Sequence, residues 1–328
     1  MSAVERIGSI APGLSRLLAY RQEDLRHDVA AGLSVAVVTL PVGVAYAQLA
    51  GFNPVTGLYA SILPLVAYAI FGTSRQLIVG PDAATCALVA AAVAPLAGGN
   101  EALYLSLSLT LTFLAGLMCI GGSLLRLGAL ADFLSKPILV GYMNGVAISI
   151  ALGQLGKVFG FRIEASGIIP RLMEIATKFD STHLPTVVVA LLTFSLLAIT
   201  PRLLPRFPAP LVAMLGSGIA VAFFKLEELG VSTVGVVPAG LPSLHLPSIP
   251  LDMLPELMAS AAGVALISYS SMTVTARSFA AKNGYHLDSD QEMAALGAAN
   301  IAAAISQGFA ISGTDSRTAT SDVSGGRT

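Results

Sequence analysis

The sequence predicts an all-α polytopic membrane protein that is built on an inverted repeat. Of its 328 residues 55% are hydrophobic and only 11% are charged, whereas a soluble domain carries about 25% charged residues. The mean hydropathy is +0.78. Two hexads with the pattern G-x-D-x-x-T begin at Gly80 and Gly313, each inside apolar sequence. An acidic residue behind a helix-breaking glycine at membrane depth is costly and usually marks a functional site.

Hydropathy and helix breakers predict about ten membrane segments. A full span needs roughly 20 residues, so two segments are exceptional. The third is a span only if Pro81 begins it, and the tenth is short, polar and bounded by glycine, as expected of a half-helix. The ten segments are predicted near residues 29–48, 55–71, 78–97, 103–125, 137–155, 184–200, 209–224, 258–281, 290–306 and 310–324.

Residues 1–27 are polar and lack the apolar core of a signal peptide, so we expect a cytoplasmic N-terminal segment with a short helix at the membrane surface. Residues 28–328 are expected to form one transmembrane domain. Within it, residues 226–257 are rich in Pro and Gly and are expected to form an extracellular connection. With the N-terminus inside, twelve of the 18 Lys and Arg residues lie on the cytoplasmic side of the membrane and five on the outer side, and Arg317 lies inside the tenth segment. This bias predicts a multi-pass protein of the inner or plasma membrane with its N-terminus inside.

The two hexads lie 233 residues apart, from Gly80 to Gly313. The same shift carries segment one onto segment eight and segment two onto segment nine. One repeat therefore holds seven segments, and because seven is odd, the second repeat is inverted in the membrane. The first repeat is predicted at about 28–225 and a partial second repeat at about 258–328. A complete second repeat needs about four more spans, so we expect a truncated chain or partner segments from elsewhere.

Several classes of function are disfavoured by the composition. A net charge of −1 argues against a nucleic-acid partner. The sequence has no His/Cys cluster with metal spacing, no phosphate-binding loop and no Ser-His-Asp arrangement, so we expect neither an enzyme nor a cofactor or metal site. Cys86 and Cys119 lie in apolar segments and are expected to be small buried residues. The four histidines lie in loops or at segment edges, which argues against a histidine proton relay.

Several motifs resemble the SulP family of sulfate permeases and anion exchangers, and the resemblance runs over nearly the whole chain. The motifs are Asp28-Val-Ala-Ala-Gly-Leu-Ser34, Leu40-Pro-Val-Gly-Val-Ala-Tyr-Ala-Gln-Leu-Ala-Gly-Phe-Asn-Pro-Val-Thr-Gly-Leu-Tyr59, Ser74-Arg-Gln-Leu-Ile-Val-Gly-Pro-Asp82, Lys136-Pro-Ile-Leu-Val-Gly-Tyr-Met-Asn-Gly145, Ala280-Ala-Lys-Asn-Gly-Tyr285, Gln291-Glu292 and Ser312-Gly-Thr-Asp-Ser-Arg-Thr318.

The resemblance implies a seven-plus-seven inverted-repeat fold of fourteen segments with a core (segments one to four and eight onward) and a gate. Segments three and ten are then half-crossing elements whose N-termini face each other around the anion. The implied activity is secondary transport of an inorganic anion, with sulfate the default, by alternating access. We also expect a homodimer in the lipid bilayer. The sequence departs from the family because segments eleven to fourteen and the usual cytoplasmic STAS domain are missing.

Facing helix N-termini make an anion cradle, because they present partial positive charge and unpaired N–H groups. Small residues there let the backbone approach the ligand. The alternative is that these small residues only pack helices. The first cradle is predicted to contain Gly80, Asp82, Ala83, Ala84 and Thr85. The second is predicted to contain Thr314, Asp315, Ser316, Arg317 and Thr318.

Arg317 is a cation inside the tenth segment, and the resemblance places a basic residue near the anion at this position. The alternative is a buried salt bridge with Asp82 or Asp315. Two carboxylates beside one Arg attract an anion weakly unless one is protonated. We therefore expect Asp82 or Asp315 to take up a proton with the anion, which gives proton-coupled symport. The alternative for both residues is helix N-capping.

The resemblance also places Tyr46 near the anion, although an interfacial aromatic is the alternative. Ser271 stands where many bacterial relatives of the family carry a carboxylate that is tied to proton coupling. Either coupling lies with the hexad aspartates, or the protein exchanges anions or conducts them uncoupled, or Ser271 is an engineered change. A helix-packing hydroxyl is the remaining alternative. Bicarbonate, chloride and dicarboxylates stay open as substrates, as do a passive anion channel and an inactive membrane fragment.

Overall fold

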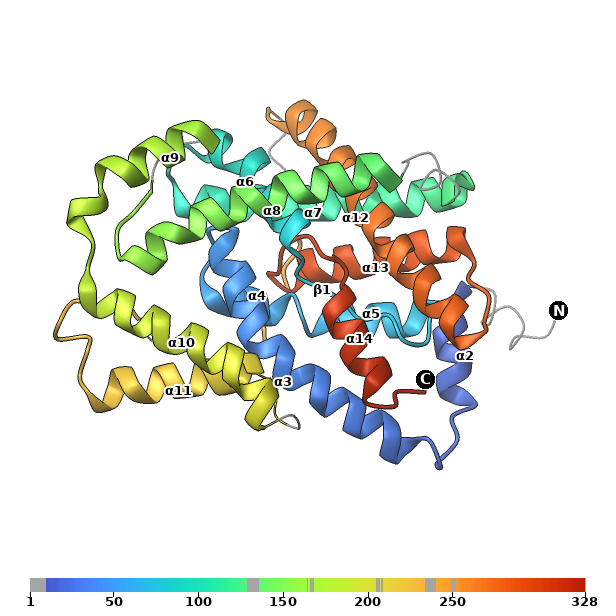
Figure 1. The fold of residues 1–328 in the computed structure, drawn as a ribbon. Coiled ribbons are helices and arrows are strands. Elements are labelled where there is room, and N and C mark those ends of the chain that lie inside the picture. Colours follow the sequence, from blue (N-terminus) through green and yellow to red (C-terminus); the bar gives the residue numbers. More distant parts are fainter. Residues whose placement is uncertain are drawn as a thin grey trace. The chain divides into compact units, whose positions relative to one another are not determined.

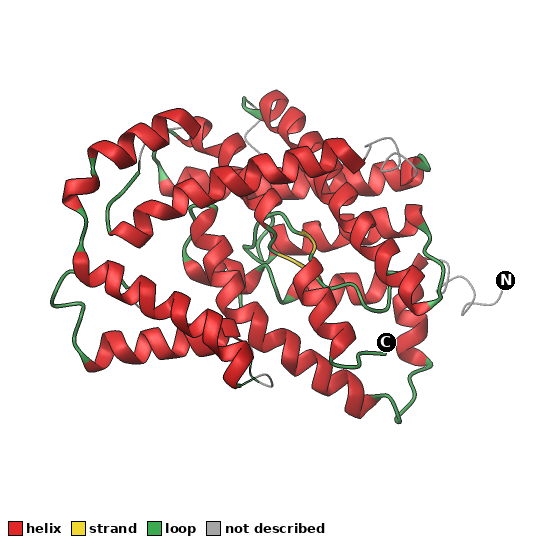
Figure 2. Ribbon diagram, viewed as in Figure 1, coloured by secondary structure: helices red, strands yellow, loops and turns green. Residues whose placement is uncertain are grey.

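The fold is described from a computed structural model and is helical apart from one two-stranded sheet in the part that is described (Figures 1 and 2). The described residues are 10–128, 136–163, 165, 168–204, 207, 209–233, 240–248 and 252–327. The chain divides into two compact units. Unit 1 comprises Met1–Leu139 with Pro238–Thr328, and unit 2 comprises Val140–Val237.

The first part of unit 1 contains helices whose ends are set by proline, glycine and capping side chains. Pro54 begins α4 in its first turn, with the Asn53 side chain accepting from Val55 N at 3.2 Å. Gly98 ends α6 with φ 56°, a left-handed conformation that favours glycine. The elements are α2 (Pro12–Leu18), α3 (Leu25–Leu49), α4 (Pro54–Tyr59), α5 (Leu63–Phe71), β1 (Val79–Gly80), α6 (Ala83–Ala97) and α7 (Glu101–Leu124).

The second part of unit 1 repeats this order after residue 253. Gly284 ends α12 with φ 70°, and Asp288 begins α13 by accepting from Asp290 N at 3.0 Å and Gln291 N at 3.1 Å. The elements are α12 (Leu254–Asn283), α13 (Ser289–Ile305), β2 (Ser312–Gly313) and α14 (Asp315–Val323).

The predicted segments agree with the helices of the structure except in detail. The segment expected at 55–71 is broken into α4 and α5, with a turn between Ala60 and Ile62. Within the described residues five helical stretches are long and apolar enough to cross a membrane. They are Leu25–Leu49, Pro54–Phe71, Glu101–Leu124, Leu184–Leu203 and Leu254–Asn283.

Helix α13 packs against α7 and α5 in the centre of unit 1. Its contact with α7 is made through backbone, because a Cβ on Gly116 would lie 2.8 Å from Gly297 O and a Cβ on Gly297 would lie 2.6 Å from Gly116 O. Small residues permit such close helix approach in membranes. Cys86 and Cys119 are buried and free, as predicted.

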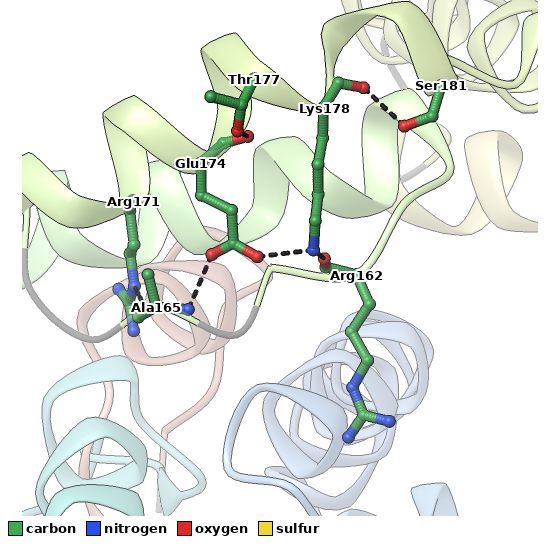
Figure 3. A network of polar contacts seen from close by, with 7 residues as sticks. All are labelled: Arg162, Ala165, Arg171, Glu174, Thr177, Lys178 and Ser181. Atoms are coloured by element: carbon green, nitrogen blue, oxygen red, sulfur yellow. Dashed lines mark hydrogen bonds and ion pairs between the residues drawn. The ribbon is translucent and has the colours of Figure 1, made fainter.

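Unit 2 contains most of α8 (Lys136–Phe159), then α9 (Ile168–Thr177), a short 3-10 helix (Phe179–Ser181), α10 (Leu184–Leu203) and α11 (Ala209–Phe223). Helices α10 and α11 pack against each other. Helix α9 was not predicted; it lies in the polar loop after α8. Its Glu174 accepts from Ala165 N at 2.7 Å and from Lys178 Nζ at 2.6 Å (Figure 3). Lys178 also donates to Arg162 O at 2.9 Å, so the loop is fastened to α9.

Candidate functional site

The two hexads meet in the structure through the strands that precede their helices. Strands β1 and β2 pair antiparallel, with Val79 opposite Gly313 and Gly80 opposite Ser312. The 233-residue shift carries Val79–Gly80 onto Ser312–Gly313, so each strand pairs with its own repeat equivalent. The pairing is reciprocal, because each residue faces the repeat equivalent of its own neighbour: Val79 faces the equivalent of Gly80, and Gly80 faces the equivalent of Val79. A local two-fold axis between the strands has this property, and the inverted repeat predicted from the spacing has the same symmetry.

Helix α6 begins directly after β1 and is capped by Asp82. The Asp82 carboxylate accepts from Ala84 N at 3.2 Å and Thr85 N at 3.5 Å, so the N-capping alternative for this residue is realised. The Thr85 hydroxyl donates to Asp82 O at 3.0 Å, and Thr85 is fully buried. Ala83 is only half-buried and lies at the open end of the helix.

Helix α14 begins with Thr314 as its N-cap residue, and no side chain caps its first turn. Thr314 instead turns to the first repeat, where its N–H and hydroxyl both donate to Ile78 O, at 2.9 and 2.8 Å. The Thr318 hydroxyl accepts from Ile78 N at 3.0 Å. The first-turn N–H groups of α14 are therefore less engaged by side chains than those of α6, which leaves this helix end better suited to an external anion.

Arg317 reaches from α14 to the start of α6 and is 1% exposed. Its Nη2 donates to Pro81 O. No salt bridge joins it to Asp82 or Asp315 within the described residues, which excludes that alternative there. Its Nε and Nη1 are buried and have no hydrogen-bond partner among the described residues. A Cβ on Gly80 would lie 2.7 Å from Nη1, so the glycine gives the guanidinium its space.

Neighbouring helices hold β2 and α14 in place. Asn300 on α13 accepts from Ile311 N at 3.0 Å and donates to Ile311 O at 3.3 Å. Both backbone polar groups of Ile311 therefore have a hydrogen-bond partner. The Ser312 hydroxyl donates to Ser268 O on α12 at 2.7 Å. The Thr275 hydroxyl of α12 donates to the Asp315 carboxylate, which does not cap α14.

The remaining predicted site residues lie on α3, α12 and α14. Tyr46 is half-buried on α3, a helix that packs against α6 and α14. Asp315 and Ser316 are exposed in the first turn of α14. Ser271 lies on α12 one turn before Thr275, whose hydroxyl donates to its carbonyl at 3.3 Å.

Sequence reasoning missed the role of Glu292, which was singled out only as part of a family motif. It lies in the first turn of α13, is 2% exposed, and anchors the loop that leads into β1. Its Oε1 accepts from Thr73 N and Thr73 Oγ1, both at 2.6 Å, and from Ser74 N at 3.0 Å. Its Oε2 accepts from Tyr68 Oη at 2.6 Å. An acidic residue in the first turn of a helix is explained by its favourable interaction with the helix dipole. The sequence around Glu292 therefore contains no signal for its hydrogen-bond partners, which lie more than 200 residues away.

Comparison with known proteins shows the family of this chain. The model of the sulfate permease family matches residues 25–328. The chain belongs to the sulfate permease family. As a member of it, the chain is similar to a probable sulfate transporter of Mycobacterium tuberculosis, with 42% identity over 97% of this chain and 57% of the relative. It is 32% identical to human solute carrier family 26 member 6, over 92% of this chain and 43% of that protein. The chain thus spans about half the length of the curated relatives it matches.

Solved structures of two relatives share the fold of this sulfate permease family member. The murine solute carrier 26 family member A9 anion transporter in its inward-facing state superposes with a TM-score of 0.90 at 25% identity, covering 100% of this chain and 58% of that one. The transmembrane domain of a cyanobacterial bicarbonate transporter superposes with a TM-score of 0.83 at 24% identity, covering 94% and 80%. The inverted-repeat transporter fold and the multi-pass membrane assignment are thereby confirmed.

Proposed function

We propose that this chain carries out secondary transport of an inorganic anion, with sulfate the first candidate. The anion is held between the N-termini of α6 and α14, and alternating access exposes it to either side. The observation that carries the proposal is the buried Arg317, whose Nε and Nη1 have no partner among the described residues. A buried cation without hydrogen-bond acceptors is costly, and an oxyanion at the uncapped end of α14 supplies those acceptors.

Uptake of radiolabelled sulfate into proteoliposomes tests this function. The wild-type chain is expected to accumulate sulfate, and Arg317→Gln is expected to lose most uptake at equal protein level. Arg277→Gln is the matched control, because Arg277 is exposed on α12. Competition by bicarbonate, chloride and dicarboxylates ranks the alternative substrates. Equal uptake by wild type and Arg317→Gln would contradict the proposed binding site.

Proton coupling is proposed for one of the two hexad aspartates, Asp82 or Asp315. Asp82 is half-buried and caps α6, whereas Asp315 is exposed and does not cap α14. Of the variants Asp82→Asn and Asp315→Asn, the one that replaces the coupling residue is expected to flatten the pH dependence of uptake, and the other should keep the wild-type pH profile. If both variants keep the wild-type pH profile and a protonophore has no effect, exchange or an uncoupled channel replaces symport. The half-buried Ser271 is consistent with either of those mechanisms.

The inactive-fragment alternative makes a separate prediction. The chain would show no uptake, and a chimera that appends the remaining part of the mycobacterial relative would restore it. If Arg317→Gln in that chimera abolishes the restored uptake, the result would still support the proposed anion site at Arg317.

A further inference from the structure

A second basic site lies beside the paired hexads, in a cavity of about 190 Å³ between α2, α5 and the loop that leads into β1. Ile78 and Ser321 line its side nearest the hexads, and neither arginine of the cavity belongs to a hexad. Two guanidinium groups line it, from Arg16 on α2 and Arg75 in the loop. Tyr20, Tyr68 and Ser74 add polar side chains, and Leu17 closes one edge. The described lining contains no Asp or Glu.

The two arginines have no carboxylate partner within the described residues. Arg16 Nη1 donates to Thr73 O at 2.7 Å, and Arg75 lies over the Tyr285 ring with its Cζ 5.6 Å from the centroid. The acidic group within electrostatic range of Arg16 is Glu292, whose oxygens already accept four hydrogen bonds. Burial lowers the pKa of Arg16, and the positive charge of Arg75 lowers it further. Two cations thus line one cavity, and neither forms an ion pair within the described residues, although the Tyr20 hydroxyl of the lining donates to the Asp28 carboxylate at 2.8 Å.

The walls of this cavity are fixed before any ligand arrives. Glu292 holds the backbone N–H groups of Thr73 and Ser74, and the Tyr285 hydroxyl contacts Ser74 Oγ at 2.9 Å and accepts from Arg75 N at 3.3 Å. A preformed site avoids the cost of ordering a loop on binding. Helix α2 also exposes Leu17 and Leu18, as expected of a short helix at a membrane surface.

We propose that Arg16 and Arg75 bind a tetrahedral oxyanion, a phosphoryl or sulfuryl group, at this membrane-surface cavity. Paired guanidinium groups match the oxygens of such anions geometrically, and basic pockets beside membrane helices bind lipid head groups. The group is supplied either by a free anion or by a phospholipid head group. This site is independent of the transported anion, because its residues differ from those of the hexads.

Fluorescence of a single introduced tryptophan tests the proposal, since the chain contains no Trp. Leu17→Trp places the reporter at the cavity edge. The purified chain in neutral detergent is titrated with inorganic phosphate at constant ionic strength, using chloride as the balancing salt. In a second arm it is mixed with phosphatidylcholine vesicles that contain or lack phosphatidic acid. The phosphate titration is repeated with Arg317→Gln, which separates this response from any response at the hexads.

A saturable response is expected in at least one arm. Arg16→Gln and Arg75→Gln should each weaken it about tenfold, the size of one lost charge-assisted hydrogen bond. Arg21→Gln is the matched control, because Arg21 is exposed and does not line the cavity. A response to phosphate identifies a free-anion site, and a response confined to phosphatidic acid identifies a lipid site. No response in either arm, or equal weakening by Arg21→Gln, would overturn the proposal.

Discussion

Replacement of Glu292 by alanine is expected to destabilise unit 1 far more than the loss of an exposed carboxylate. The substitution leaves Thr73 N–H, Ser74 N–H and the Tyr68 hydroxyl without their acceptor in a site that is 2% exposed. Each unsatisfied buried group costs about 1–3 kcal/mol, so the loss is roughly 3 kcal/mol at the lower bound. At about 2 °C per kcal/mol for a large domain, the apparent unfolding temperature should fall by about 6 °C or more.

Glu292→Gln separates hydrogen bonding from charge. The amide oxygen can replace Oε1 as acceptor for Thr73 and Ser74, and the Tyr68 hydroxyl can turn to accept from the amide nitrogen. Only the charge assistance of these bonds is lost while the acceptor oxygen stays in place, so a smaller fall than for Glu292→Ala is expected.

Fluorescence-detected size-exclusion chromatography after heating measures both variants in detergent. Glu256→Ala is the control, because Glu256 is an exposed carboxylate in the first turn of α12, and it should change the apparent unfolding temperature by less than about 2 °C. The reasoning is refuted if Glu292→Ala behaves like this control. It is also refuted if Glu292→Gln is as damaging as Glu292→Ala, because charge rather than acceptor loss would then decide the effect.

Three further changes probe the paired hexads. Gly80→Ala should abolish most sulfate uptake, because its Cβ would lie 2.7 Å from Arg317 Nη1; Gly32→Ala, with open space around it, should leave uptake unchanged. Arg317→Lys should retain a cation but raise the apparent KM for sulfate more than about tenfold, since the planar fork is lost; an unchanged KM would argue against direct contact. Asn300→Ala should lower thermal stability by about 1–3 kcal/mol by orphaning the Ile311 backbone groups, and unaltered melting would show that β2 does not need this anchor.

The sequence was sufficient for features that are local or periodic. The 233-residue spacing of Gly80 and Gly313 predicted equivalent helix starts, and β1 and β2 lie at this same spacing. Membrane segments were predictable because a long run of apolar residues is visible in the sequence itself and does not depend on tertiary contacts. Capping by Asp82 was anticipated as an alternative because the cap precedes its helix in sequence.

Features that depend on distant partners were not predictable. The break between α4 and α5 is a separate case: Pro64 in the first turn of α5 is a local signal for it, but the segment was drawn from hydropathy, which does not register that proline. Helix α9 lies in a polar loop that was expected to be irregular. A salt bridge to Asp82 or Asp315 was the alternative for Arg317, but the structure gives its Nη2 the carbonyl of Pro81. A backbone acceptor is available at any residue, so side-chain chemistry did not point to it.

The strand pair has a consequence for biosynthesis. Val79 meets its partner Gly313 only after 234 further residues have been made, which takes roughly 10–50 s at ordinary translation rates. During that time the backbone edge of β1 lacks its partner, and Gly80 lacks the Arg317 guanidinium that packs against it. Strand β1 is therefore an unpaired strand edge over that interval, and the two hexads cannot pair until β2 has been made.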